Sequence, residues 1–552
     1  MRASTYPLNR WCVWVDDAVT FARTMQPIYG SDSSLLSGQR QLFVELLSAA
    51  TGWLGLDAEV VISRAPVRAN LMGRHIDHNG GFVNPIALPA EVLIVVEARQ
   101  DDVVVVRNLE ESRYPERCFS ITDELPEGKI SSAVDWDAWT MRALEKRMAV
   151  VKDADWVDYI KAVVVYFQEM YGSKKDSTTW PFRGMNVLVS GNAPPSVGLG
   201  SSSALIVAMA QAFCTFNELL LPDSEFIQAC GQGEWYVGTR GGSGDHAAIL
   251  YARPGVVSRI GSFPTSVAHV PFPKGYRVVI FNSHERVNKA GAGRDVFNQR
   301  VACYELGMMM LHHEYPGLAE EARHLRDLTP KSSGFELAKV FETLLSLPER
   351  VTLGEIRERI SHDADSKVDR IVLGHKPPIN GYPIRGVCLF GVAECVRSEM
   401  AADLLERNDL LTLGRMMAVS HDGDRRVRYD RYYETKPYSS GTPDHYLRSL
   451  ITASDSSHPM HEYAQLWRQP GVYGCSTPRI DMMVDVAQRV QGVVGAQISG
   501  AGLGGCMMVI VEEDRVSHLL RRMNDKIYAP NGLEPDFIDA VPVGGAGVIS
   551  LE

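Results

Sequence analysis

The chain has 552 residues, of which 45% are hydrophobic and 22% are charged, and its formal net charge is −11. This is the composition of an ordinary globular protein with ample apolar material for a core, and the length favours about two to four domains. The acidic balance argues against a general nucleic-acid binder, which needs a basic surface, but leaves room for a local basic pocket.

The cysteines and the apolar segments indicate the cellular compartment in which the protein is expected. There are nine cysteines, widely spaced and without a CxxC pair, which argues against a disulfide framework or a zinc site. The first residues, MRASTYPLNRWCVWVDDAV, contain no apolar run that could serve as a signal segment. No stretch reaches the roughly 18 consecutive apolar residues of a membrane span. We therefore expect a cytoplasmic protein whose partners include neither membrane nor nucleic acid.

The first half of the chain predicts helices, then strands, then both. Residues 1–57 predict helices, because apolar residues recur at three- and four-residue spacing. From residue 58, segments rich in Val and Ile predict strands. Residues 155–171 predict an amphipathic helix, and FRGMNVLVSGNAPP predicts a strand that ends in a Pro-rich turn.

The second half predicts a strand at 276–285, a helix near 295–313 and a charged, mostly helical segment at 314–375. The end of the chain predicts a helix, a Gly-rich turn, a strand and a helix. This order of elements indicates an α+β protein with at least two lobes. The boundary between the lobes is expected within residues 275–375.

Gly and Ser crowd together in PPSVGLGSSSA, residues 194–204, which we call the serine motif, directly before a predicted helix. The first N–H groups of a helix lack intrahelical partners and attract anions. Glycines let the backbone approach a phosphate, and serines can add hydroxyl ligands. The motif therefore predicts a phosphate site, although an isolated run of this kind is also typical of a capped turn.

Charged side chains cluster in APVRANLMGRHIDHNGG, residues 65–81, which we call the arginine motif. Such a dense cluster after a predicted strand indicates a ligand-binding loop. The alternative is a hairpin turn at HNGG with solvated charges around it. That alternative leaves the clustering of Arg and His unexplained.

Two carboxylates lie eleven positions apart in GEWYVGTRGGSGDHAAIL, residues 233–250, which we call the carboxylate motif. The intervening GTRGGSG can fold Glu234 and Asp245 toward one point, where one carboxylate can ligate a metal and the other accept a proton. A helix-end Glu and a capping Asp give the same pattern. Further on, ISGAGLGGC, residues 498–506, forms the glycine motif, either a tight loop or backbone that approaches a ligand.

In order and spacing, these motifs resemble those of the GHMP kinases and, among them, the galactokinase-type sugar kinases. The serine motif is similar to their phosphate loop, the arginine motif to the galactokinase signature, and the glycine motif to their third motif. Weaker similarities occur in WVDYIKAV, VFNQRVACYE, GRMMAVSH and GVYGCSTPRIDMMVDVA. The resemblance covers about 58–312 and 390–515.

The resemblance implies an α+β, two-lobed GHMP kinase fold with the active site between the lobes. The first lobe would carry a left-handed βαβ unit, the second would be a ferredoxin-like α/β lobe, and helical insertions would be added. We expect a helical extension at 1–57, the N-terminal lobe at 58–275, and the C-terminal lobe at 276–552 with an insertion at about 314–375.

The resemblance also implies an enzyme, a sugar-1-kinase that uses ATP and Mg²⁺. Asp245 corresponds to the catalytic base, and Arg68 to the cationic residue that steadies the transferring phosphoryl group. Ser202 and Glu234 correspond to Mg²⁺ ligands. The positions that correspond to ATP-binding residues are Gly198, Leu199, Gly200, Ser201, Ser202, Ser203, Gly500 and Gly502. Those that correspond to sugar-binding residues are His75, Asp77 and Gly242.

Two further positions of the expected sugar site depart from the galactokinase pattern. Arg74 stands where galactokinases have a glutamate that is expected to bind the sugar. A guanidinium favours an anion, so the substrate could be a uronic acid such as galacturonate or glucuronate. Alternatively, Arg74 forms a salt bridge within the protein and the sugar is neutral. Phe297 stands where galactokinases have a tyrosine, which removes one hydrogen bond and weakens the case for galactose itself.

Two other functions stay open. The first is a GHMP kinase for a non-sugar alcohol of the mevalonate or homoserine type, against which HIDHNGG argues. The second is a catalytically silent sensor of sugar and ATP, against which the retained set Asp245, Glu234, Ser202 and Arg68 argues. The sequence leaves open the sugar, the oligomeric state, the pathway and the roles of residues 1–57, 314–375 and 425–470.

Overall fold

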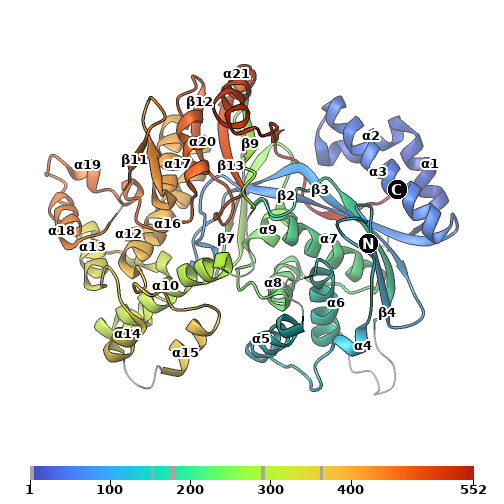
Figure 1. The fold of residues 1–552 in the computed structure, drawn as a ribbon, viewed down its shortest axis with the longest axis horizontal. Helices are drawn as coiled ribbons and strands as arrows, with labels where there is room; N and C mark the ends of the chain where they lie inside the picture. Colours follow the sequence, from blue (N-terminus) through green and yellow to red (C-terminus); the bar gives the residue numbers. More distant parts are fainter. Residues whose placement is uncertain are drawn as a thin grey trace.

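The computed structural model describes residues 5–150, 155–172, 182–286, 292–360, 365–438 and 441–551. The two largest β-sheets lie near the centre of the molecule, with helices around them (Figure 1). One sheet comes mainly from the N-terminal half of the chain and the other from the C-terminal half. This arrangement confirms the predicted α+β class. In the described part, no helix combines the length and apolar character that crossing a bilayer requires.

Three helices precede β2, the first long strand of the first large sheet: α1 (Leu8–Asp16), α2 (Ala18–Tyr29) and α3 (Ser33–Leu54). The carboxylates of Asp17 and Asp32 accept hydrogen bonds from backbone N–H groups in the first turns of α2 and α3, which fixes where these helices begin. The helical prediction for residues 1–57 is confirmed for its described part, since residues 1–4 lie outside it. The short strand β1 (Tyr6–Pro7), which pairs with β2, departs from that prediction.

The first large sheet has the strand order β1-β2-β3-β6-β4-β5. Its main strands are β2 (Glu59–Asn70), β3 (Pro85–Ala98), β4 (Val103–Asn108), β5 (Arg117–Ser120) and β6 (Met185–Gly191). The pair β4–β6 is parallel and the other pairs are antiparallel. Near the end of the chain, β15 (Gly547–Val548) pairs with β2, so these last residues join the first sheet.

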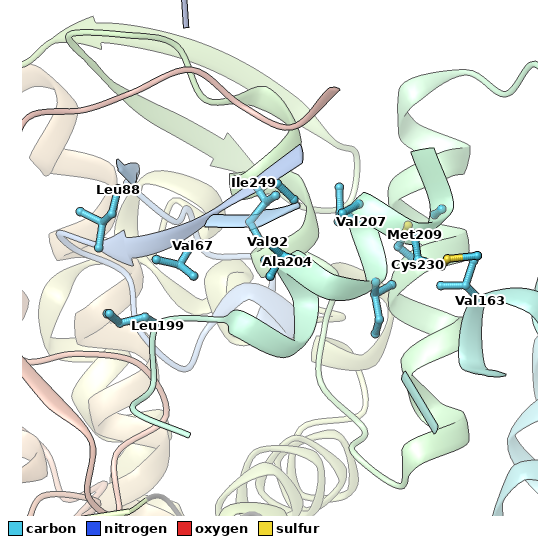
Figure 2. Close-up of a cluster of buried hydrophobic side chains, with 14 of the residues drawn as sticks. Val67, Leu88, Val92, Val163, Leu199, Ala204, Val207, Met209, Cys230 and Ile249 are labelled. Carbon is cyan, nitrogen blue, oxygen red and sulfur yellow. The ribbon is translucent and has the colours of Figure 1, made fainter. Parts of the chain in front are cut away.

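Alternate residues of the central strands pack on opposite faces of this sheet, as the two-residue period of a strand requires. Val92, Ile94 and Val96 of β3 join the core under the helices of the first lobe. Leu93 and Val95 join a second core under α1–α3. Figure 2 shows part of the first core, where Val67 and Val92 lie near Ala204 and Val207. Because β3 is apolar on both faces, helices cover it on both sides.

The helices of the first lobe position the serine and carboxylate motifs. They are α4 (Ile121–Glu124), α5 (Ala133–Val150), α6 (Asp158–Tyr171), α7 (Ser201–Phe216), α8 (Asp223–Glu234) and α9 (Gly244–Tyr251). The predicted helix at 155–171 is confirmed by α6, and the helix expected after the serine motif by α7. The hairpin β7 (Val256–Gly261) and β8 (Ser266–Pro271) follows α9.

The second large sheet is antiparallel, with the order β12-β13-β9-β14. Its strands are β9 (Tyr276–Asn282), β12 (Val493–Ile498), β13 (Cys506–Glu512) and β14 (Phe537–Ala540). Helices connect β9 to β12 and β13 to β14, the latter through α21 (Val516–Met523). This is the β-α-β-β-α-β order of a ferredoxin-like unit. The ferredoxin-like prediction for the second lobe is therefore confirmed.

A helical region lies between β9 and β12 and has its own apolar core. Its helices of nine or more residues are α10 (Ala292–Glu314), α13 (Leu337–Ser346), α15 (Asp365–Leu373), α16 (Ile384–Glu406), α17 (Leu410–Asp424), α18 (Asp444–Ala453) and α20 (Pro478–Ala487). Shorter helices are α11 (Leu318–Glu321), α12 (Pro330–Ser333), α14 (Leu353–Arg359) and α19 (His461–Ala464). The hairpin β10 (Val427–Tyr429) and β11 (Thr435–Pro437) follows α17. Residues 314–375 are thus mostly helical, as predicted, with 361–364 outside the described residues.

Candidate active site

The four motifs meet at one hollow, which we call the motif pocket. The arginine, serine, carboxylate and glycine motifs come from segments far apart in the chain, yet all four line this pocket. The predicted site residues that line it are Arg68, Arg74, His75, Asp77, Gly198, Gly200, Ser203, Glu234, Gly242, Asp245, Phe297, Gly500 and Gly502. The predicted convergence of the motifs on one cleft is therefore what the structure shows.

Arg68 and Asp245 form a two-point ion pair at the pocket. Arg68 lies near the end of β2, and its Nε donates to Oδ1 of Asp245 at 2.7 Å while Nη2 donates to Oδ2. Nη1 donates to the backbone oxygen of Gly198 at 3.0 Å. The Asp245 side chain is 41% exposed, so the carboxylate is oriented by the guanidinium and still open to the pocket.

The serine motif leads directly into α7. Gly200 occupies the N-cap position with φ 77° and supplies no side chain to the first turn. The first N–H groups of α7 therefore stay free of a capping side chain from this position, which suits an anion. A Cβ at Gly200 would lie 3.3 Å from Cζ of Arg68, so glycine lets the guanidinium approach the helix start.

The serine and glycine motifs are in backbone contact. A Cβ at Gly500 would lie 2.1 Å from the backbone oxygen of Gly198, which only a glycine avoids. The N–H of Cys506 donates to the oxygen of Val197 at 3.0 Å. Leu199, predicted to bind ATP, buries its side chain in the core, and its backbone oxygen accepts from the N–H of Arg68 at 3.0 Å. Its contribution is to hold the loop.

Glu234, at the end of α8, lies beside two residues that could orient it. The Oγ of Ser203 donates to Oε2 of Glu234 at 3.4 Å. Nε2 of the fully buried His246 lies 3.2 Å from the same oxygen. Ser202 and Glu234 were predicted as Mg²⁺ ligands, and the structure brings the hydroxyl of the neighbouring Ser203 within hydrogen-bond distance of Glu234. His246 was missed, and its only signal was its place next to Asp245.

The oxygen donors at Glu234 suit a hard cation. Mg²⁺ is usually held by one or two carboxylates together with substrate phosphates rather than by an all-protein cage. Among the described residues, no group of three or more His, Cys, Asp or Glu side chains could hold a metal ion. A carboxylate with a neighbouring hydroxyl, next to a phosphate-type helix start, fits Mg²⁺ bound in this shared way.

Asp77 packs against the loop that precedes α9. A Cβ at Gly242 would lie 2.4 Å from Oδ2 of Asp77, and one at Gly244 would lie 2.9 Å from it. Burial is the largest single influence and would raise the pKa of Asp77, but the hydrogen bond from Nδ1 of His78, 3.2 Å from Oδ1, the charge of His78 and backbone hydrogen bonds together lower the pKa to about 2. The structure thus brings Asp77 and Gly242 together, as predicted, with a charged carboxylate at neutral pH.

The side chains of Arg74 and His75 turn toward the second lobe. The Arg74 guanidinium donates to Oγ of Ser420 at 2.8 Å and lies 3.2 Å from Oδ2 of Asp424. The His75 ring stacks on Tyr473 with centroids 4.0 Å apart and an interplanar angle of 13°. Both side chains are at most 3% exposed. Of the two readings of Arg74, this geometry favours the salt bridge within the protein.

The helical insertion also reaches the arginine motif. Arg326, in the short 3-10 helix Leu325–Leu328, donates to the backbone oxygens of Gly80 at 2.8 Å, Ser262 at 2.9 Å and Phe263 at 3.0 Å. One guanidinium therefore joins the insertion, the turn of the arginine motif and the β7–β8 hairpin. The sequence predicted no role for the insertion, because no local pattern distinguishes Arg326.

Comparison with known families locates three matches. The GHMP kinases N terminal domain matches residues 158–253, and the GHMP kinases C terminal domain matches residues 451–529. The galactokinase galactose-binding signature matches residues 55–98. These segments contain the carboxylate motif, the glycine motif and the arginine motif, respectively, and the first also contains the serine motif.

Curated relatives and a solved structure agree with these matches. The chain is 24% identical over 477 residues to a galactokinase of Dictyostelium discoideum, covering 86% of this chain and 85% of the relative. It is 26% identical over 491 residues to a galactokinase of Chloroflexus aurantiacus, covering 88% and 92%. The fold resembles the crystal structure of Lactococcus lactis galactokinase complexed with galactose, with a TM-score of 0.61 and 19% identity, covering 90% of this chain and 97% of that one.

Proposed function

We propose that this chain, which is similar to galactokinases and matches GHMP kinase models, is a sugar-1-kinase that phosphorylates a neutral, galactose-like monosaccharide at the anomeric hydroxyl with ATP. The observation that carries the proposal is the contact of Arg68 with both Asp245 and the serine motif. The Arg68 guanidinium would then hold both Asp245, the base for the sugar hydroxyl, and the serine motif, the phosphate site. Phosphoryl transfer depends mainly on such positioning and charge neutralisation.

In the proposed reaction, the carboxylate of Asp245 accepts the proton of the anomeric hydroxyl. The sugar oxygen forms a bond to the γ-phosphorus of ATP, the bond from that phosphorus to the β–γ bridging oxygen breaks, and ADP leaves. Arg68 stabilises negative charge on the transferring group and fixes the orientation of Asp245. The N-terminus of α7 and the backbone of the glycine motif hold the phosphates of the nucleotide.

Glu234 with Ser203 or Ser202 would hold Mg²⁺ in this proposal. The ion, when bound, neutralises charge on the phosphates. Glu234 supplies the carboxylate, and the serine hydroxyls at the start of α7 supply neutral oxygen donors beside it. His246 lies behind Glu234 and keeps the carboxylate turned toward the pocket.

A galactose-like sugar is favoured over a uronic acid for two reasons. The signature that matches residues 55–98 is the galactose-binding signature of galactokinases. The Arg74 guanidinium, the cation that would have recognised a sugar carboxylate, already has Asp424 and Ser420 as partners. Asp77, charged and packed beside Gly242, is the side chain from the arginine motif that we expect to bind sugar hydroxyls.

The test is a coupled assay of ADP release with galactose, arabinose, galacturonate and glucuronate, together with NMR of the product to locate the phosphate. We expect turnover with a neutral sugar and phosphate on C1. Turnover with galacturonate or glucuronate alone would show that the sugar is anionic. Binding of ATP and sugar by calorimetry without turnover would show a sensor, and turnover with mevalonate or homoserine a different acceptor.

A further inference from the structure

Arg74 contacts the glycine motif as well as Asp424. Its Nη1 donates to the backbone oxygen of Ile498 at 2.9 Å, and Ile498 is the last residue of β12, directly before the glycine-rich loop 499–505. We propose that Arg74, together with Asp424, is a positioning residue that fixes this loop to the arginine motif. Binding at the sugar site and binding at the nucleotide site would then be coupled through one buried guanidinium.

The first end of the loop is held from two sides. While Nη1 of Arg74 binds the oxygen of Ile498, the N–H of Ile498 donates to Nδ1 of His421 at 3.3 Å. Nε2 of His421 lies 3.2 Å from Oδ1 of Asp481, and both side chains are fully buried. The backbone of Ile498 is thus clamped between the arginine motif and α17.

The second end of the loop is held through Asp424. Oδ1 of Asp424 accepts from the N–H of Cys475 at 3.3 Å, and Oδ2 faces Arg74 at 3.2 Å. The oxygen of Cys475 in turn accepts from the N–H of Leu503 at 2.6 Å, and a Cβ at Gly502 would lie 2.4 Å from that oxygen. The Arg74–Asp424 pair is therefore linked to the glycine-rich loop at two points: directly at Ile498, before the loop, and through Cys475 at Leu503, near its end.

The arginine motif is tied to the same cluster by its backbone. Oε1 of the buried Glu394 accepts from the N–H groups of Gly73 at 2.9 Å and Arg74 at 3.2 Å, and from Oγ of Ser420 at 3.1 Å. Nε of Arg397 donates to Oε2 of Glu394 at 2.6 Å. Because Glu394 is occupied by these donors, the Arg74 guanidinium is left to Ser420, Asp424 and Ile498.

A guanidinium is suited to this task because its fixed fork can reach several acceptors at once. A lysine keeps the charge but offers a compact ammonium, and a glutamine keeps neither the charge nor the fork. Loss of a hydrogen bond to a buried charged group changes a local equilibrium by about tenfold or more. The expected consequence is a loosened loop and a weaker nucleotide site, with the sugar contacts of Asp77 intact.

The experiment compares Arg74→Gln and Arg74→Lys with the unaltered chain and with Arg107→Gln, a matched control that removes an exposed ion pair with Glu116. Hydrogen exchange at residues 499–505 is measured without ligand, and ADP and galactose affinities are measured by calorimetry. We expect Arg74→Gln to speed exchange and raise the Kd for ADP about tenfold or more, Arg74→Lys to fall between, and Arg107→Gln to change neither.

Asp424→Asn provides a second route if Arg74→Gln fails to fold, and it should loosen the same loop. Unchanged exchange and ADP affinity in both Arg74 variants would overturn the proposal. The proposal would also be overturned if Arg74→Gln changed only the preference between galactose and galacturonate, because Arg74 would then contact the sugar. The inference rests on the proposed function in one respect, namely that the nucleotide is the ligand of the glycine-rich loop. The hydrogen-exchange result stands even if the unaltered chain shows no sugar turnover.

Discussion

Arg68 and Asp245, 177 residues apart in the chain, share a two-point ion pair at the motif pocket. Arg68 lies on a strand of the first sheet and Asp245 in the first turn of α9, so the ion pair joins these two elements. The third donor of the guanidinium reaches the oxygen of Gly198 at 3.0 Å. One guanidinium therefore holds the carboxylate that we propose as the base next to the serine motif.

Replacing Asp245 by Asn should abolish transfer without unfolding the protein. The amide keeps the shape but cannot act as a base, so we expect kcat to fall on the order of 10²–10⁴-fold. ADP release measures the loss, and calorimetry with ATP shows that binding persists. Asp101→Asn, which disrupts a half-exposed ion pair with Arg99, is the matched control. Near-normal turnover by Asp245→Asn would show that another group takes the proton.

Gly242→Ala should weaken sugar binding selectively. The added methyl group would lie 2.4 Å from Oδ2 of Asp77, so the carboxylate must shift away from its position in the pocket. We expect KM for the sugar to rise about tenfold or more, as loss of a charged hydrogen bond predicts, with little change in KM for ATP. Gly52→Ala on α3 is the control, because a Cβ there meets no atom within 4 Å and the residue does not line the motif pocket. Equal effects of both variants would argue against the Asp77 contact.

Glu234→Gln should raise the Mg²⁺ concentration needed for half-maximal activity, since the amide is a weaker ligand for a hard cation than a carboxylate. Among the serines, Ser203→Ala should have a larger effect than Ser202→Ala, because Oγ of Ser203 is the hydroxyl 3.4 Å from Glu234. Titration of activity with Mg²⁺ at saturating ATP distinguishes the two variants. A larger effect of Ser202→Ala than of Ser203→Ala would indicate that Ser202 is the Mg²⁺ ligand.

Acid should destabilise the protein through Asp424. Burial would raise the pKa of Asp424, but Arg74 and His75 outweigh it and lower the pKa from 3.8 to about 2. A carboxyl whose folded pKa is lowered stabilises the fold above its unfolded pKa, and that contribution, on the order of 2 kcal/mol, disappears between about pH 4 and pH 2. Denaturant unfolding at both pH values measures the loss. The free energy of unfolding of Asp424→Asn should fall less between these pH values than that of the unaltered chain. An equal fall in both proteins would show that other groups cause it.

Arg326→Ala should raise KM for the sugar several-fold and leave KM for ATP unchanged. The variant removes the donors that hold the oxygens of Gly80, Ser262 and Phe263, and Gly80 closes the turn that carries Asp77. Steady-state kinetics with each substrate varied in turn tests this. Arg323→Ala, an exposed position in the same insertion, is the comparison. A matching rise in KM for ATP would show that the insertion acts on the whole pocket.

The sequence by itself determined the parts of this protein that depend on local chemistry. A run of Gly and Ser before apolar residues specifies a helix start with free N–H groups, and α7 begins at Ser201. The period of apolar residues specified the helices of residues 1–57 and the strands after residue 58. The order of the motifs was enough to predict that Arg68, Glu234 and Asp245 share one pocket, because that order resembles a known family.

Only the tertiary structure decided which partners the polar side chains take. From the sequence, Arg74 could equally have bound a sugar carboxylate. No neighbouring residue predicts its hydrogen bond to Ser420, which lies 346 residues away. The same holds for the contact of Ser203 with Glu234 and for the reach of Arg326 to the arginine motif. A guanidinium or a carboxylate can pair with any opposite charge. Which one it meets is set by how apolar faces pack the lobes together, and that packing is a property of the whole chain.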